Sequence, residues 1–339
     1  MTMKQYIEKC LSGSGLTADE ASDALDLIMT GQATDIQIAG LLIALRAKGE
    51  TVDELVGFAR TMRAKAVRVT LDDPDAIDMC GTGGDGQGTF NISTVATFVV
   101  VGAGVTVAKH GNRSVSSRSG SADLLGALGV NIQIPADHVQ ECINRVRVGF
   151  LFAPLFHPAM KFAGKARGEL AVRTIFNMLG PITNPAGVRR QLVGTFRQDV
   201  ASTIACALGR LSTVRACVVH SHDGLDEITA AGETAVCETQ EDGSVREYSV
   251  SPAAFGLDPQ PVSSMAGGDA KENAAIAMGI LNGGKVAGRS VVIENAAMGI
   301  LVAGKAANLL EASASAAESI DSGRALEALK KLIDFSNRP

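Results

Sequence analysis

The sequence is poor in aromatic residues and lacks the features that mark several classes of protein. It contains no tryptophan among 339 residues, and aromatic residues make up only 4%. No segment is strongly basic and the net charge is −5, which argues against a surface of lysines and arginines for nucleic acid. The longest apolar runs, 97–108 and 148–156, are shorter than the roughly 20 residues that cross a bilayer. We therefore expect neither nucleic acid nor membrane as a partner.

Cysteine is present but not in a pattern that predicts disulfides or a metal ribbon. The six cysteines, at positions 10, 80, 142, 206, 217 and 237, form no Cys-x-x-Cys pair, and residues 1–15 have no apolar run of the secretory type. We expect reduced, mostly buried thiols and a cytoplasmic protein. Glycine is abundant, with 37 residues against 10 prolines, which indicates tight turns and close approaches of the backbone.

The hydrophobic pattern predicts two parts. In residues 1–70, apolar residues recur at helical spacing after Thr17, Asp35 and Thr51, and Glu20 stands at the capping-box position after Thr17. From about residue 71, β-branched strands alternate with helices, which predicts an α/β domain with a mainly parallel central sheet. The expected strands include 76–80, 105–108, 214–219 and 290–293. Ligands bind such sheets at the carboxyl ends of the strands.

A glycine-rich loop, GTGGDG at 81–86, follows the first expected strand and precedes a helix that begins near Asn91. Consecutive glycine N–H groups can form an anion-binding nest, and the helix N-terminus with Ser93 and Thr94 adds further donors. The loop lacks the Lys-Ser/Thr ending of a nucleotide P-loop. It predicts a phosphate or pyrophosphate cradle; the alternative is a tight turn that binds nothing.

Two further polar segments also follow strands. KHGNR at 109–113 leads into a serine-rich loop, 114–121, whose cations suit a phosphate or carboxylate, with a solvated charged loop as the alternative. The helix expected from Ser121 offers a second anion-binding terminus. DGLDE at 223–227 carries paired carboxylates, which can hold a Mg²⁺ that bridges phosphate oxygens or can cap a helix. Zinc on His220, His222 and Asp223 is a further alternative, but no other ligand stands at a recognised spacing.

The fourth group consists of FHPAMK at 156–161 and RTIFN at 173–177. Arg167 or Arg173 can clamp a carboxylate through two parallel hydrogen bonds. His157 is either a donor beside an apolar pocket or a structural histidine.

In this order, the motifs resemble those of the anthranilate phosphoribosyltransferases, a family of tryptophan biosynthesis. The resemblance rests on GTGGDGQGTFNIST, VAKHGNRSVSSRSGSADLLGALGV, FHPAMK, RTIFNMLGPITNP and DGLDE, with weaker matches at 267–274 and 295–297, and spans nearly the whole chain. Such enzymes transfer the phosphoribosyl group of 5-phosphoribosyl-1-pyrophosphate (PRPP) to the amine of anthranilate.

The resemblance also implies a fold and an assembly. The fold is that of the nucleoside phosphorylases, with a helical domain of residues 1–70 that a segment near 165–188 rejoins. Residues 71–164 and 189–339 then form the α/β domain that binds PRPP. The implied assembly is a homodimer through the helical domain, and the implied cofactor is Mg²⁺, two ions per active site.

Carried over by position, the resemblance implies three sets of site residues. The PRPP set is Gly81, Gly84, Asp85, Thr89, Asn91, Ser93, Thr94, Lys109 and Ser121. The anthranilate set is Gly81, His110, Asn112, His157 and Arg167, and the metal set is Ser93, Asp226 and Glu227. No covalent nucleophile is implied, the question whether His110 takes the amine proton stays open, and His110 and Arg167 are the candidates for a direct part in the reaction.

The sequence departs from the family pattern beside Arg167. Gly168 stands where a second basic residue is usual, and Ala171 replaces a usual glycine. The departure leaves the PRPP site intact and predicts weaker anthranilate binding or a substituted aminobenzoate as acceptor. A pyrimidine-nucleoside phosphorylase and a non-catalytic, nucleic-acid-binding relative are the alternatives on the same scaffold.

Overall fold

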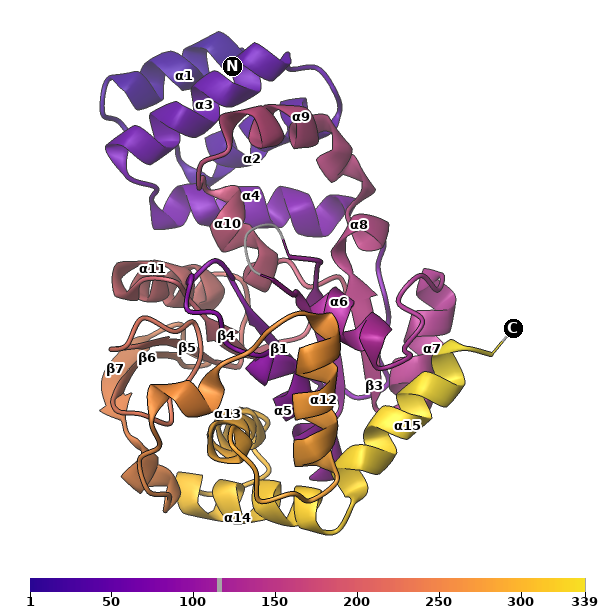
Figure 1. Ribbon diagram of the computed structural model, residues 1–339. Coiled ribbons are helices and arrows are strands. Elements are labelled where there is room, and N and C mark those ends of the chain that lie inside the picture. Colours follow the sequence, from indigo (N-terminus) through magenta and orange to yellow (C-terminus); the bar gives the residue numbers. More distant parts are fainter. Residues whose placement is uncertain (115–117, 339) are drawn as a thin grey trace.

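The computed structural model describes residues 1–114 and 118–338 and has a helical lobe above an α/β lobe (Figure 1). Ser116 and Ser117 of the serine-rich loop lie outside the described residues. The helical lobe comprises α1 (Met3–Leu11), α2 (Ala18–Met29), α3 (Asp35–Lys48), α4 (Val52–Lys65), α9 (Lys161–Leu170) and α10 (Phe176–Leu179). The segments beside it contain α8 (Ala153–Phe156) and the 3-10 turns η1 (Pro158–Met160) and η2 (Gly180–Ile182).

Threonine caps begin the predicted helices of this lobe. The hydroxyl groups of Thr17 and Thr51 accept from the N–H groups of Glu20 and Glu54 at 3.2 and 3.3 Å, and each glutamate accepts from its cap's N–H at 2.8 Å. These reciprocal bonds satisfy N–H groups that a helix start leaves open. Both predicted caps are confirmed. One helix more than predicted, α1, precedes them.

The helical lobe is built from two distant parts of the sequence. After α8 the chain returns to the bundle, where α9 packs against α2 and α3 (Figure 1). Arg63 of α4 donates to the carbonyl oxygens of Ile182 and Leu211 at 2.8 and 3.2 Å, which ties the bundle to the chain that leaves it. None of the described helices is long and apolar enough to cross a membrane.

Within the described residues, one sheet has seven strands in the order β3-β2-β1-β4-β5-β6-β7. The neighbours from β3 to β5 pair in parallel, while β6 and β7 are antiparallel additions. The strands are β1 (Ile77–Gly81), β2 (Val107–Gly111), β3 (Val148–Phe152), β4 (Arg190–Gly194), β5 (Arg215–Ser221), β6 (Thr234–Thr239) and β7 (Val245–Val250). In β1 and β4 the register sets Gly81 opposite Gly194, so both strands end at the same edge.

Helices cover both faces of this sheet. The two faces belong to different cores, since adjacent residues such as Met79 and Cys80 of β1 point to opposite sides. One face packs against α5 (Ile92–Gly102), α6 (Ser121–Ala127), α12 (Ala270–Leu281), α13 (Arg289–Val302), α14 (Leu309–Asp321) and α15 (Arg324–Ser336). The other packs against α11 (Gln198–Gly209) and the helical lobe. At the β3 side lies α7 (Ala136–Val146), and the turns η3 (Pro252–Phe255) and η4 (Val262–Met265) follow β7.

The prediction of a strand at 290–293 is wrong, because these residues lie in the first turns of α13. Nearly every residue of α13 is buried, so its β-branched run shows neither the alternation of a strand nor the stripe of a surface helix. The sequence reading also missed the β6–β7 hairpin.

Candidate active site

The glycine-rich loop and the acidic loop meet at the carboxyl edge of the sheet. The N–H of Gly83 donates to Oδ2 of Asp226 at 2.8 Å, and the N–H of Ser93, in the first turn of α5, donates to Oε1 of Glu227 at 3.1 Å. A Cβ atom on Gly194 would lie 1.6 Å from the carbonyl oxygen of Asp226, and one on Gly81 would lie 2.9 Å from Oδ2 of Asp226. Glycine at both strand ends therefore admits the acidic loop.

The carboxylates at this junction are half-buried and carry like charges. Burial, with the charge of Asp85 adding, raises the pKa of Asp226 to about 7. Burial and the charge of Asp226 raise the pKa of Glu227 to about 8. Asp85 Oδ2 is buried and has no hydrogen-bond partner among the described residues. A divalent cation would lower the free-energy cost of holding the carboxylates of Asp85, Asp226 and Glu227 close together. These oxygen donors therefore suit Mg²⁺.

These carboxylates would not enclose an ion by themselves. No group of three or more histidine, cysteine, aspartate or glutamate side chains in residues 1–114 and 118–338 is arranged to hold a metal. Mg²⁺ typically takes one or two carboxylates and completes its shell with water and substrate phosphates. The arrangement therefore suits an ion that arrives with a phosphate ligand.

The acidic loop is held from below by α13. Asn295 is fully buried; its Oδ1 accepts from the N–H of Ile228 at 3.0 Å, and its Nδ2 donates to the carbonyl oxygen of Ile228 at 2.9 Å. Asp223 accepts from the hydroxyl groups of Ser221 and Thr229. The backbone on both sides of Asp226 and Glu227 is therefore fixed before any ligand binds.

A second set of hydrogen bonds joins the start of α5 to neighbouring segments. Asn91 donates to the carbonyl oxygen of Ser119 at 3.0 Å and accepts from Nδ2 of Asn273 at 3.1 Å. Asn273 also accepts from the N–H of Gly268 at 2.7 Å, and Thr89 pairs with Ala266 across a β-bridge. The side chain of Asn91 is thus used within the protein, and it aligns three loops.

Two polar groups of the PRPP set point into the interior. Lys109 is 3% exposed and donates to the carbonyl oxygen of Met79 and to Oγ of Ser93, the latter at 3.4 Å. Burial lowers the pKa of Lys109. Thr94 Oγ1 is buried without a partner among the described residues and lines, with Lys109, a cavity of about 10 Å³. The N–H of Thr94 donates to the carbonyl oxygen of Asn91 at 3.1 Å, so it is also used within the protein.

The start of α6 differs from the expected free terminus. The N-cap is Gly120, and the carboxylate of Asp123 accepts from the N–H groups of Gly120 and Ser114 at 2.9 and 3.1 Å. Ser121 Oγ donates to the carbonyl oxygen of Asn112 at 3.2 Å. Asp123 thus takes up two N–H groups beside the expected terminus, and the anion-binding role of Ser121 stays a prediction.

The rings of His110 in β2 and His157, directly after α8, lie against each other. Their ring centroids are 5.2 Å apart, and burial lowers the pKa of His110 to about 3 and that of His157 to about 4. Nδ1 of His110 lies 3.1 Å from the carbonyl oxygen of Gly180. A carbonyl only accepts, so Nδ1 carries the proton and the buried, unpartnered Nε2 offers a lone pair.

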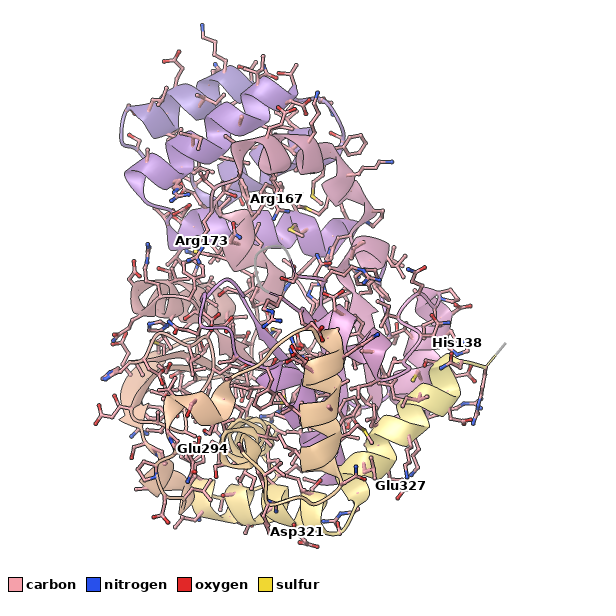
Figure 2. The ribbon with its side chains drawn as sticks, viewed as in Figure 1. His138, Arg167, Arg173, Glu294, Asp321 and Glu327 are labelled. Atoms are coloured by element: carbon pink, nitrogen blue, oxygen red, sulfur yellow. The ribbon has the colours of Figure 1, made fainter. Side chains whose placement is uncertain are left out.

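The two candidate arginines have different surroundings (Figure 2). The guanidinium of Arg167 lies over Phe176, 4.8 Å from the ring centroid, and makes no hydrogen bond or ion pair with any described residue. Burial lowers its pKa. Arg173 instead donates to the carbonyl oxygen of Gly84. Of these two arginines, Arg167 is therefore the one whose guanidinium N–H groups make no hydrogen bond to a described residue and are open to a ligand.

The zinc alternative is not supported. His220 Nδ1 lies 2.8 Å from the carbonyl oxygen of Thr195, and His222 is exposed beside Glu233, 3.9 Å away. Asp223 accepts from two hydroxyl groups. The three side chains face different partners.

Comparison with known proteins decides the family. The glycosyl transferase family models match this chain, the helical bundle domain at residues 4–66 and the a/b domain at 73–326. An anthranilate phosphoribosyltransferase of Pelotomaculum thermopropionicum is 52% identical, with 98% of this chain and 96% of the relative covered. This chain belongs to the anthranilate phosphoribosyltransferase family.

Solved members of the anthranilate phosphoribosyltransferase family share the whole fold. The enzyme from Thermus thermophilus superposes with a TM-score of 0.93 at 41% identity, covering 98% of this chain and 99% of the other. The enzyme from Saccharomyces cerevisiae in complex with PRPP and Mg has a TM-score of 0.89 at 29% identity, covering 98% and 97%. The predicted fold class, a small helical domain and a larger α/β domain with a mainly parallel sheet, is confirmed.

The two departures from the family pattern, Gly168 and Ala171, lie in different surroundings. A Cβ atom on Gly168 would have no neighbour within 4 Å, so the position is open. Ala171 ends α9 with φ +49°, a left-handed conformation that favours glycine. The departure at 171 thus puts a side chain where the backbone suits none.

Sequence reasoning gave no role to Asn273 and Asn295, although both lie in its weaker matches. Each is a fully buried amide on a largely apolar helix, α12 or α13. A buried amide requires hydrogen-bond partners, so an asparagine within an apolar run was the available signal.

Proposed function

We propose that this site transfers the phosphoribosyl group of PRPP to the amine of anthranilate, giving N-(5′-phosphoribosyl)anthranilate and pyrophosphate for tryptophan biosynthesis. The observation that supports it most is that the glycine-rich loop and the start of α5 both donate hydrogen bonds to one half-buried acidic pair, Asp226 and Glu227. That junction joins a nest of N–H groups to a magnesium donor set, as a pyrophosphate leaving group requires.

The PRPP site in this proposal is the carboxyl edge of the sheet around the glycine-rich loop. The members are those of the sequence set: Gly81, Gly84, Asp85, Thr89, Asn91, Ser93, Thr94, Lys109 and Ser121. Asn91 acts through the loops it aligns, and Thr94 supports the start of α5, where its N–H donates to the carbonyl oxygen of Asn91. Lys109 contributes positive charge beside the start of α5, because its Nζ lies 3.4 Å from Oγ of Ser93.

Two Mg²⁺ ions per site are part of the proposal, held through Ser93, Asp226 and Glu227. When bound, Mg²⁺ neutralises negative charge on pyrophosphate oxygens. The N–H groups of Gly83 and Ser93 hold the carboxylates of Asp226 and Glu227 in place, and the remaining N–H groups of the glycine-rich loop supply fixed dipoles where that charge grows. The sugar carries the opposite, growing positive charge, so stabilising the leaving group lowers the barrier without a covalent intermediate.

The acceptor site lies between the lobes in this proposal and comprises Gly81, His110, Asn112, His157 and Arg167. Arg167 binds the anthranilate carboxylate through its open donors, stacked on Phe176. His110 is neutral at pH 7 because its pKa is about 3, so it accepts a hydrogen bond from the amine through Nε2 and does not act as a base. Orientation of the amine is the main contribution.

The helical domain, residues 1–70 with the returning segment near 165–188, is also proposed as the dimer interface; residues 71–164 and 189–339 form the PRPP domain. Leu11, Ile36 and Ile43 of this domain are 69%, 85% and 40% exposed. Exposed apolar side chains on one bundle suit a second copy of the chain. An Ile36→Glu/Ile43→Glu double variant should sediment as a monomer, whereas an unchanged dimer would contradict the interface. All six cysteines are free, consistent with the cytoplasmic placement we propose.

The reaction is tested by following loss of anthranilate fluorescence with PRPP and Mg²⁺. The protein has no tryptophan and two tyrosines, so its own emission is weak. Loss that requires both PRPP and Mg²⁺ is expected. An Asp226→Asn/Glu227→Gln variant should be nearly inactive even at saturating Mg²⁺, and normal turnover would refute the metal assignment. Thymidine cleavage by phosphate, with no anthranilate consumption, would indicate a phosphorylase instead.

A further inference from the structure

Arg173 joins three parts of the molecule at the boundary between the lobes (Figure 2). It follows α9 in the returning segment, and its Nη2 donates to the carbonyl oxygen of Gly84 in the glycine-rich loop. Its own carbonyl oxygen accepts from Nη1 of Arg46 on α3. One residue therefore connects the N-terminal bundle and the returning segment to the loop of the other lobe.

A second contact strengthens the connection. The Arg173 guanidinium lies over the ring of Phe196, 4.1 Å from the centroid. Phe196 follows β4, and its N–H donates to Oγ1 of Thr82 at 3.1 Å. Thr82 in turn donates its N–H to the carbonyl oxygen of Gly194 at 2.9 Å. Arg173 thus contacts the loop directly at Gly84 and, through Phe196, at its base.

The loop needs support at this point. Gly83 and Gly84 have φ of +65° and +77°, so their backbone is free to turn in ways that other residues resist. The N–H of Gly83 is held by Asp226, and the far end is held where the N–H of Gly267 donates to the carbonyl oxygen of Gly88. Arg173 holds the stretch between these two fixed ends.

We propose that Arg173 is a positioning residue that couples the docked helical lobe to the shape of the pyrophosphate-binding loop. A peptide carbonyl that turned toward the phosphates would repel them. With the Gly84 carbonyl bonded to Arg173, the loop presents N–H groups instead. The identity of the ligand rests on the proposed function, whereas the effect on the loop does not.

The test compares Arg173→Ala and Arg173→Lys with a matched control, Arg197→Ala. Arg197 also lies over Phe196, at 6.0 Å, but its Nε pairs with Asp199 and not with the loop. The first readout is hydrogen exchange of a peptide covering 81–90 in the ligand-free protein. Arg173→Ala should exchange about fivefold faster, as expected for loss of a hydrogen bond, and Arg197→Ala should match the wild type.

The second readout is calorimetric binding of PRPP with Mg²⁺. Arg173→Ala should bind about tenfold more weakly, and Arg173→Lys, which keeps one donor, should recover part of the loss. The KM for anthranilate at saturating PRPP and the unfolding midpoint should stay unchanged, which a merely structural residue would not allow.

Unchanged exchange at 81–90 in Arg173→Ala would overturn the proposal. Weaker PRPP binding in that case would mean that Arg173 contacts the phosphates itself. Faster exchange in a protein whose wild type transfers no phosphoribosyl group would support the positioning role and refute the proposed function, so the two failures are distinguishable.

Discussion

Replacing Arg167 with glutamine should remove the recognition of the anthranilate carboxylate and leave PRPP binding intact. The guanidinium lies half-buried over Phe176, and no described residue makes a hydrogen bond or ion pair with it, so its donors are free for the acceptor. Hydrogen bonds to charged groups contribute about 1.5–3 kcal/mol each. A loss of about 3 kcal/mol corresponds to about 150-fold lower kcat/KM for anthranilate. Arg167→Lys keeps the charge without the planar fork and should lose on the order of tenfold.

The assay measures pyrophosphate release with anthranilate and, in parallel, with aniline, which lacks the carboxylate. With aniline, the wild type and Arg167→Gln should be equally slow, because the missing carboxylate removes the partner of Arg167. The unfolding midpoint should not fall, since the substitution removes a half-buried charge that forms no ion pair with a described residue. An equal penalty with both acceptors, or a raised KM for PRPP alone, would refute the assignment.

Three further predictions concern groups outside the acceptor pocket. Burial raises the pKa of Glu294 from 4.5 to about 8, and neither oxygen has a partner among the described residues, so stability should fall as pH rises through about 8. Glu294→Gln should abolish that slope in urea unfolding at about pH 5 and about pH 9, and equal slopes would contradict the buried neutral acid. Asn295→Asp loses the donor to Ile228 and should raise the Mg²⁺ concentration needed for half-maximal PRPP binding by about tenfold, while Asn282→Asp, at an exposed helix end, should not. Ala171→Gly relieves a left-handed alanine and should raise the unfolding free energy by about 0.5 kcal/mol in denaturant titrations; a decrease would show that φ at 171 carries no strain.

Local signals in the sequence were sufficient to predict much of the fold and to predict that the glycine-rich loop and the acidic loop lie close together. The threonine caps of α2 and α4 depend on residues three positions apart, and both were predictable. The convergence of the glycine-rich and acidic loops followed from parallel strands ending at one edge. The β6–β7 hairpin had a signal too, Asp242-Gly243, which the strand pattern around it did not bring out.

Other features depend on partners that are distant in the sequence. The roles of Arg167 and Arg173 differ because one lies over Phe176 and the other reaches Gly84, 89 positions away. Asp123 caps α6, a role that the serine-rich sequence around Ser121 obscured. The prediction of a strand at the start of α13 was wrong because burial on all sides removes the hydrophobic periodicity that distinguishes a helix from a strand.

The division of the helical lobe between two stretches of chain bears on how the protein matures during synthesis. The carbonyl oxygen that receives Arg46 belongs to a residue 127 positions later, and the one that receives Nε of Arg63 lies 119 positions later. A nascent chain that has emerged only through α4 therefore exposes the surface that α9 and α10 later cover. The N-terminal bundle cannot complete its core before three strands of the other lobe have been made, so the lobe formed first in sequence is finished late.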